Sequence, residues 1–153
     1  MKETECCIYY KDVSDLFSKL ESLEDGWFDG QQGKALKSLK WFIDDFNNKF
    51  TEDMPIIFPN IEGGLELVWK FFKGGDVTLT LSVNLRSRKA YFYLVYPRFK
   101  SVFWDLDMSL SESWHCLNKV IKAVQSCKDE YELKYEIQKV ENESPFLQQG
   151  YDL

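Results

Sequence analysis

The sequence has little of the residues and motifs on which common enzyme classes depend. It contains one histidine, His115, and has no G-x-S-x-G elbow, Walker phosphate loop or dinucleotide fingerprint. Its cysteines lack the C-x₂₋₄-C spacing that is typical of zinc sites; they are Cys6, Cys7, Cys116 and Cys127. A lone histidine without an orienting motif is a poor basis for nucleophilic catalysis. We therefore predict no catalytic residue, no metal and no cofactor.

Long apolar runs and an excess of basic charge are also missing. No apolar run approaches the roughly 20 residues that cross a bilayer. The first five residues are acidic and lack the basic and apolar regions of a signal peptide. The chain has 19 Lys and Arg against 25 Asp and Glu, a net charge of −6, which disfavours nucleic acid as a partner. We expect a cytoplasmic protein with reduced thiols and no membrane association.

The residues that are present predict an α+β domain. Of the 153 residues, 44% are hydrophobic and 16% are aromatic, which is enough for a core and excludes a disordered chain. We predict a single domain over 1–153, with 1–11 and 144–153 peripheral. The β-favouring run 6–10 is consistent with an edge strand.

Apolar residues at helical spacing predict two N-terminal helices. The first follows Asp12 and the second runs over roughly 34–50. The second helix would place Lys34, Lys37 and Lys40 in its N-terminal half, against the helix macrodipole. We interpret these charges as a solvated face, and a charged face for a partner is the alternative.

From Gly63 onward the apolar period changes from 3.6 to 2, which predicts an antiparallel meander of four strands. The strands are expected over 65–72, 77–85, 89–96 and 99–106, with a tight turn at 73–76. A capping-box pattern from Ser109 to Glu112 predicts a C-terminal helix. Residues 131–138 suit either a strand or a helix, and their unbroken alternation favours a fifth strand.

Two segments beside the predicted sheet carry a resemblance. They are Leu23-Glu24-Asp25-Gly26-Trp27-Phe28-Asp29-Gly30 and Phe58-Pro59-Asn60-Ile61-Glu62-Gly63-Gly64, the second followed by a strand with Trp69. The chain resembles, over roughly residues 16–106, a group of small uncharacterised bacterial proteins. Those proteins share a Gly-Trp-x-Asp-Gly loop, an aromatic-Pro-Thr-x-Glu-Gly-Gly segment and a Glu-Trp strand.

This chain departs from that pattern at Asn60, where the group has threonine, and at Val68, where it has glutamate. The resemblance implies a bacterial or phage-derived cytosolic protein and brings no activity with it. It draws attention to Trp27, Asp29 and Glu62 without giving them a role.

The second face of the predicted sheet is the candidate binding surface. Opposite its apolar side, the strands offer Thr, Tyr and Trp residues, of the type enriched at protein interfaces. The candidate binding residues are Tyr91, Tyr93 and Trp104 on this face, with Trp27 and Asp29 in the loop. A helix layer over both faces is the alternative. Stacked RNA is disfavoured by the element order and the acidic charge.

Two functions follow from these features. The first is a non-catalytic protein-binding module that neutralises a partner such as a toxin or defence effector, as antitoxins, immunity proteins and phage anti-defence proteins do. The alternative is a metal-dependent phosphodiester hydrolase, which requires its carboxylates to converge; they are Asp29, Glu62, Asp105 and Asp107. A homodimer through a sheet edge or through residues 131–138 is a third hypothesis.

Overall fold

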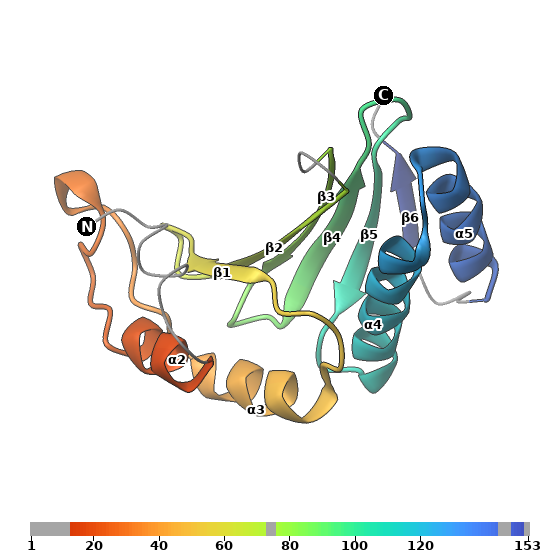
Figure 1. The fold of residues 1–153 in the computed structure, drawn as a ribbon. Coiled ribbons are helices and arrows are strands. Elements are labelled where there is room, and N and C mark those ends of the chain that lie inside the picture. Colours follow the sequence, from red (N-terminus) through yellow and green to blue (C-terminus); the bar gives the residue numbers. More distant parts are fainter. Residues whose placement is uncertain (1–12, 73–75, 144–147, 152–153) are drawn as a thin grey trace.

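The computed structural model describes residues 13–72, 76–143 and 148–151. In this part of the chain, helices pack on an antiparallel sheet, which confirms the predicted α+β class (Figure 1). The elements in chain order are α2 (Val13–Glu21), the short 3-10 helix η1 (Asp29–Gln31), α3 (Leu39–Lys49), β1 (Ile56–Pro59), β2 (Leu65–Phe71), β3 (Val77–Val83), β4 (Lys89–Val95), β5 (Val102–Asp107), α4 (Ser111–Ser126), α5 (Glu130–Glu143) and β6 (Gln148–Tyr151).

The sheet has six strands, which lie in sequence order from β1 to β6 and pair antiparallel with their neighbours. The predicted meander is confirmed as β2 to β5, and buried and more exposed residues alternate along most of each of these strands. Strands β1 and β6 extend the meander at its two edges and were not predicted from the sequence. The predicted strand at 6–10 and residues 73–75 of the predicted turn lie outside the described residues.

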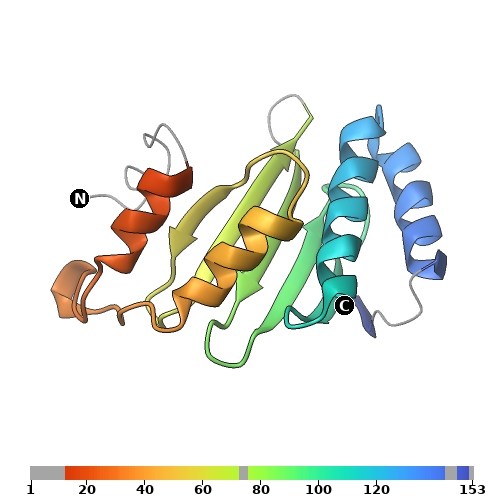
Figure 2. The same cartoon turned by 90° about the horizontal axis from the view of Figure 1, so that it is seen from below.

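The α-helices α2, α3, α4 and α5 lie on one side of the curved sheet (Figures 1 and 2). Burial of apolar surface between these two layers is the main stabilising term of the fold. The aromatic centre of the helix layer is Phe42, whose ring centroid lies 6.2 Å from that of Phe17 and 5.8 Å from that of Trp114. The buried hydrophobic strand residues that face the helices are Ile57, Leu65, Leu67, Trp69, Val77, Leu79, Leu81, Val83, Ala90, Phe92, Leu94, Val102, Trp104 and Leu106.

The predicted strand over 131–138 is wrong, because these residues belong to α5. At helical spacing, Leu133, Ile137 and Val140 form one buried stripe against the core. Tyr131 and Tyr135, which would share a strand face with Leu133, are 61% and 65% exposed. The helix therefore buries its aliphatic stripe and leaves the two tyrosines in solvent, so the alternation in the sequence does not reflect a buried strand face.

The second predicted helix starts later than expected, at Leu39 instead of residue 34. Ser38 has a φ of 66° and Gly33 a φ of 96°, and a regular helix cannot continue through left-handed residues. Lys34 and Lys37 consequently lie in the segment before α3. They do not oppose the macrodipole of α3 as helix residues, so the interpretation of a solvated helix face does not apply to them.

The predicted capping box does not form at the start of α4. The residue before the helix is Leu110, which makes no side-chain cap. Ser109 instead donates its hydroxyl hydrogen to Asp107 Oδ1 at 2.6 Å, and Ser113 Oγ donates to the Asp107 carbonyl at 2.7 Å. The carboxylate at the end of β5 thus takes the hydroxyl that would have capped the helix.

Two of the three predicted residues of the second sheet face lie there, and the third does not. Tyr91 and Tyr93 point away from the helices, whereas Trp104 pairs with Phe92 in the register and is fully buried on the helix side. Successive strand residues face opposite sides, so Trp104 lies on the other face from its neighbour Asp105, which is the register partner of Tyr91. No helix in the described part of the chain is long and apolar enough to cross a membrane.

Candidate functional site

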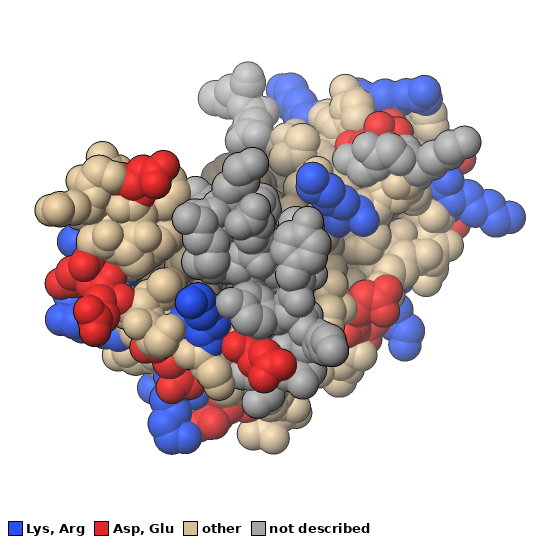
Figure 3. All heavy atoms as spheres, turned by 60° about the vertical axis from the view of Figure 1, so that its left-hand side comes forward, with Lys and Arg blue, Asp and Glu red and all other residues tan. Residues whose placement is uncertain are grey.

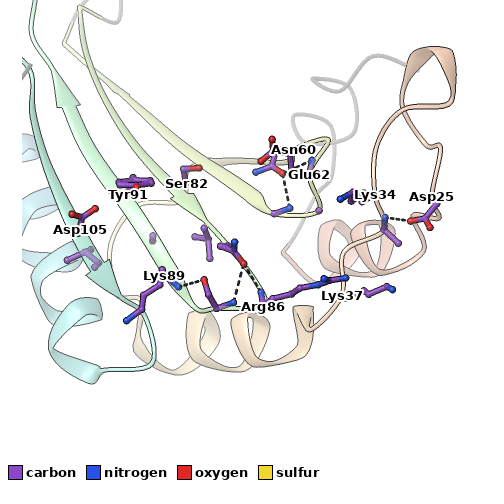
Figure 4. Close-up of a pocket in the computed structure, with 18 residues that line it drawn as sticks. Asp25, Lys34, Lys37, Asn60, Glu62, Ser82, Arg86, Lys89, Tyr91 and Asp105 are labelled. Atoms are coloured by element: carbon purple, nitrogen blue, oxygen red, sulfur yellow. Dashed lines mark hydrogen bonds between the residues drawn. The ribbon is translucent and has the colours of Figure 1, made fainter.

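A polar cavity of about 1010 Å³ lies at one end of the sheet (Figure 4). Its walls come from the segment before α3, the β1–β2 turn, the β3–β4 turn and the strands β3 to β5. The residues that line it are Asp25, Lys34, Ala35, Lys37, Asn60, Glu62, Gly63, Gly64, Ser82, Val83, Asn84, Arg86, Ser87, Lys89, Ala90, Tyr91, Asp105 and Leu106.

The β1–β2 turn is built around Asn60. Its Oδ1 accepts hydrogen bonds from the backbone N–H groups of Glu62 at 3.1 Å and Gly64 at 2.8 Å. Gly64 packs so closely that an added Cβ would lie 2.4 Å from the Val83 carbonyl oxygen. Gly63 has a φ of 91°, which glycine adopts without strain. The turn is therefore fixed, and it leaves the Glu62 side chain exposed beside the cavity.

A second wall is the loop from Asp25 to Lys37, which folds back on itself. The Trp27 indole N–H donates to the Lys34 carbonyl at 2.8 Å, and Asp25 Oδ1 accepts from the Ala35 N–H at 2.8 Å. The Lys34 N–H donates to the Ile61 carbonyl at 2.9 Å and so ties this loop to the β1–β2 turn. These bonds hold the backbone of Lys34 in place while its side chain stays exposed.

The third wall is the β3–β4 turn, which is built around Asn84. Its Oδ1 accepts from the backbone N–H groups of Arg86 at 3.0 Å and Ser87 at 3.1 Å. Its backbone N–H donates to the Lys89 carbonyl at 2.9 Å, and its carbonyl accepts from the Arg88 N–H at 2.9 Å. In Figure 4 the Arg86 side chain extends from this turn toward the segment that carries Lys37.

The cavity has an excess of basic groups over acidic ones, although the chain as a whole is acidic. Lys34, Lys37, Arg86 and Lys89 face three carboxylates. Of these four cations, only Lys89 has an ion pair within the described residues, at 3.0 Å from Asp107 Oδ2. On the side of the molecule that carries α2, basic and acidic side chains alternate (Figure 3). That side is therefore not a uniformly acidic surface.

Asp107 lies just beyond the cavity and anchors Lys89. The hydrogen bond from the Ser109 hydroxyl, followed by that from Lys89, lowers the pKa of this carboxyl to about 2. Asp107 is thus ionised throughout the physiological range, and its charge is already taken up by these partners. This leaves Lys89 less available to a ligand than Lys34, Lys37 and Arg86.

The five predicted binding residues do not form one site. Tyr91 lines the cavity and is 59% exposed, and Tyr93 lies on the same sheet face, half-buried. Trp27 braces its loop through the bond to Lys34, and Asp29 is exposed in η1 and is not part of the cavity wall. The buried Trp104 donates its indole N–H to Glu141 Oε2 at 2.9 Å, so it holds α5 on the sheet.

The thiols and the carboxylates do not gather into a metal-binding group. Within residues 13–72, 76–143 and 148–151, no group of three or more His, Cys, Asp or Glu side chains is placed to hold a metal ion. The convergence that the hydrolase hypothesis requires is thus not found in that part of the chain. Cys116 and Cys127 are buried, and burial raises the pKa of the Cys127 thiol to about 11.

Sequence reasoning missed the cavity as a site, although it noticed several of the residues in its walls. In the sequence, the four basic residues of the cavity stand as two separate pairs, Lys34 with Lys37 and Arg86 with Lys89. Only the fold brings them together, because one group precedes α3 and the other lies in the β3–β4 turn. The sequence signal for the site is the pair of turn asparagines, Asn60 and Asn84, each followed two residues later by a charged residue that lines the cavity.

Comparison of the chain with protein-family models, with curated proteins and with solved structures finds no match in any of the three. The function must therefore be argued from the site itself.

Proposed function

We propose that this chain is a non-catalytic protein-binding module that docks a partner protein on the sheet face opposite the helices. The observation that carries the proposal is the exposure of Tyr91 and Val95, which are 59% and 38% exposed on one side of β4. Tyr93 lies between them on the same side. Tyrosine supplies a large contact area at a small entropic cost and is enriched at interfaces.

The lack of a helix layer supports this choice of surface. The helices α2, α3, α4 and α5 lie on the other side of the sheet, so the strands β3 to β5 keep one side without a described helical cover (Figures 1 and 2). Thr78, the register partner of Val95, and Ser82, the register partner of Tyr91, add hydroxyl oxygens to this face. A partner with apolar and hydrogen-bonding side chains would complement such a surface.

The class of partner follows from the type of protein and not from individual residues. A small acidic chain without a catalytic group fits the role of an antitoxin, an immunity protein or a phage anti-defence protein, each of which neutralises another protein. In this proposal the chain acts in the bacterial cytoplasm, and its partner is a toxin or a defence effector.

The test is a pull-down from the natural host, followed by affinity measurement with the identified partner. Tyr91→Ala should weaken the purified complex by at least about tenfold, because interface tyrosines often contribute more than about 1.4 kcal/mol. Tyr135→Ala is the matched control, since Tyr135 is equally exposed but lies on α5. Equal affinity of both variants would place the docking surface elsewhere. The absence of any stoichiometric partner would refute the binding function.

A further inference from the structure

Three of the cations in the cavity lack a carboxylate partner among the described residues. Lys34 and Lys37 come from the segment before α3, and Arg86 comes from the β3–β4 turn. None of the three takes part in an ion pair within the described part of the chain, unlike Lys40, whose Nζ lies 3.1 Å from Asp44 Oδ2. Gathering like charges costs Coulomb energy, and an anion placed between them would recover it.

The backbone that carries Lys34 and Arg86 is held in place before any ligand binds. Both backbone polar groups of Lys34 are engaged, the N–H by Ile61 and the carbonyl by Trp27. The Arg86 N–H is bound by the Asn84 side chain. Only the side chains have to become ordered when an anion binds, so the entropic cost of binding is reduced.

The remaining walls of the cavity offer a different chemistry. Tyr91 presents an exposed ring, and its register partner Asp105 and the turn residue Glu62 present exposed carboxylates. Carboxylates accept hydrogen bonds from hydroxyl or amino groups and repel a bare anion. At about 1010 Å³, the cavity is at the upper end of the range of about 300–1,000 Å³ for small-molecule sites, far more than a simple ion needs.

We propose that this cavity binds a small phosphorylated ligand, of the class of sugar phosphates and nucleoside monophosphates. Lys34, Lys37 and Arg86 bind the phosphate group. Asp105 and Glu62 accept hydrogen bonds from the hydroxyl groups of the ligand, and Tyr91 packs against its ring. The ligand is a monomer, because a nucleic acid strand would bring its phosphates against an acidic chain. This activity goes beyond partner binding, and it is tested without a partner.

Calorimetry of the full chain at about 0.15 M salt, titrated with AMP and with ribose 5-phosphate, is the direct test. At least one of the two should bind with a Kd below about 1 mM, and adenosine and ribose should bind at least about tenfold more weakly. Inorganic phosphate should also bind more weakly than the better ligand, since it cannot reach the carboxylate wall. Equal binding of inorganic phosphate would refute the ligand class.

Charge reversal tests the assignment of the residues. Lys37→Glu and Arg86→Glu should each weaken binding of the better ligand by at least about tenfold. Lys122→Glu is the matched control, because Lys122 is exposed on α4 and lies outside the cavity. Thermal unfolding of each variant establishes that it is folded. Unchanged binding in both cavity variants, or no binding of either phosphorylated probe by the wild-type chain, would overturn the proposal.

Discussion

Replacement of Trp104 by phenylalanine should destabilise the domain strongly, although the sequence placed Trp104 on a binding surface. Its side chain is fully buried, and its ring centroid lies 5.4 Å from that of Phe92. Its indole N–H donates to Glu141 Oε2 at 2.9 Å, and this carboxylate is itself only 7% exposed. Phenylalanine keeps an aromatic ring against Phe92 but removes the donor.

The magnitude follows from two contributions. Removing the indole donor leaves the buried Glu141 carboxyl with one hydrogen-bond partner fewer, which costs about 1–3 kcal/mol. The smaller ring also removes apolar surface from the core, which adds roughly 1 kcal/mol. We expect a total of about 3 kcal/mol, and at about 2–4 °C per kcal/mol the melting temperature should fall by about 6–12 °C.

Urea unfolding followed by far-UV circular dichroism measures the change, with Tyr135→Phe as the control. Tyr135 is 65% exposed, so its substitution should change the free energy of unfolding by less than about 0.5 kcal/mol. A double-mutant cycle of Trp104→Phe with Glu141→Met, which removes the acceptor at similar side-chain length, isolates the bond between the two side chains. A loss below about 1 kcal/mol together with no coupling in the cycle would refute the placement of Trp104 and its role in holding α5.

Three further predictions concern stability and reactivity. Gly64→Ala should lower the free energy of unfolding in urea by at least about 2 kcal/mol, because the added Cβ would lie 2.4 Å from the Val83 carbonyl oxygen. A Cβ added at Gly30 would meet no atom within 4 Å, so Gly30→Ala should cost only about 1 kcal/mol, for its φ of 69°. The pKa of Asp107 is lowered from 3.8 to about 2 in the fold, so its ionised form stabilises the folded state above pH 3.8. In thermal melts, the wild-type chain should lose this stabilisation as the pH falls from about 4 to 2, and Asp107→Asn should not. The pKa of the Cys127 thiol is raised from 9.0 to about 11 in the fold, so the neutral thiol is the form that the folded state favours. Alkylation of Cys127 by iodoacetamide at pH 8 should therefore require unfolding. Rapid labelling of Cys127 in the native chain, located by mass spectrometry, would contradict this.

The meander could be predicted from the sequence because its strands have one buried face and one polar face. Leu79 and Leu81 alternate with Thr78 and Thr80, and only a period of 2 puts the leucines on one side. The face assignments of β4 were predictable for the same reason. On β5 the residues from Val102 to Trp104 are all apolar, but Asp105 and Asp107 alternate with Trp104 and Leu106. This alternation places Trp104 on the buried face, and the prediction that put Trp104 on the binding surface overlooked it.

The segment 131–138 could not be assigned from its own residues. Leu133 and Ile137 satisfy both periods, and the difference lies in Tyr131 and Tyr135, which a strand would bury and the helix leaves in solvent. A fifth strand at this point would also have to pair with the free edge of β5. That edge is taken by β6, whose residues Gln148–Tyr151 show no apolar alternation in the sequence. Whether residues 131–138 can form a strand thus depends on which segment pairs with β5, and this cannot be known from the residues of one segment.

The fold of the β1–β2 turn accounts for Asn60 and Gly64 in the segment Asn60–Gly64, but it does not account for Glu62. Asn60 is needed to bind two backbone N–H groups of the turn, and Gly64 is needed because Val83 lies too close for any side chain. The Glu62 side chain makes no hydrogen bond or ion pair with another described residue, and it stands at the rim of a cavity that holds three unneutralised cations. A carboxylate that served only to neutralise those cations would be expected to form an ion pair with one of them. The separation of the Glu62 carboxylate from the cations is instead what a ligand with an anionic end and a hydroxyl-bearing end requires. Glu62→Gln should therefore weaken binding of ribose 5-phosphate and leave binding of inorganic phosphate unchanged.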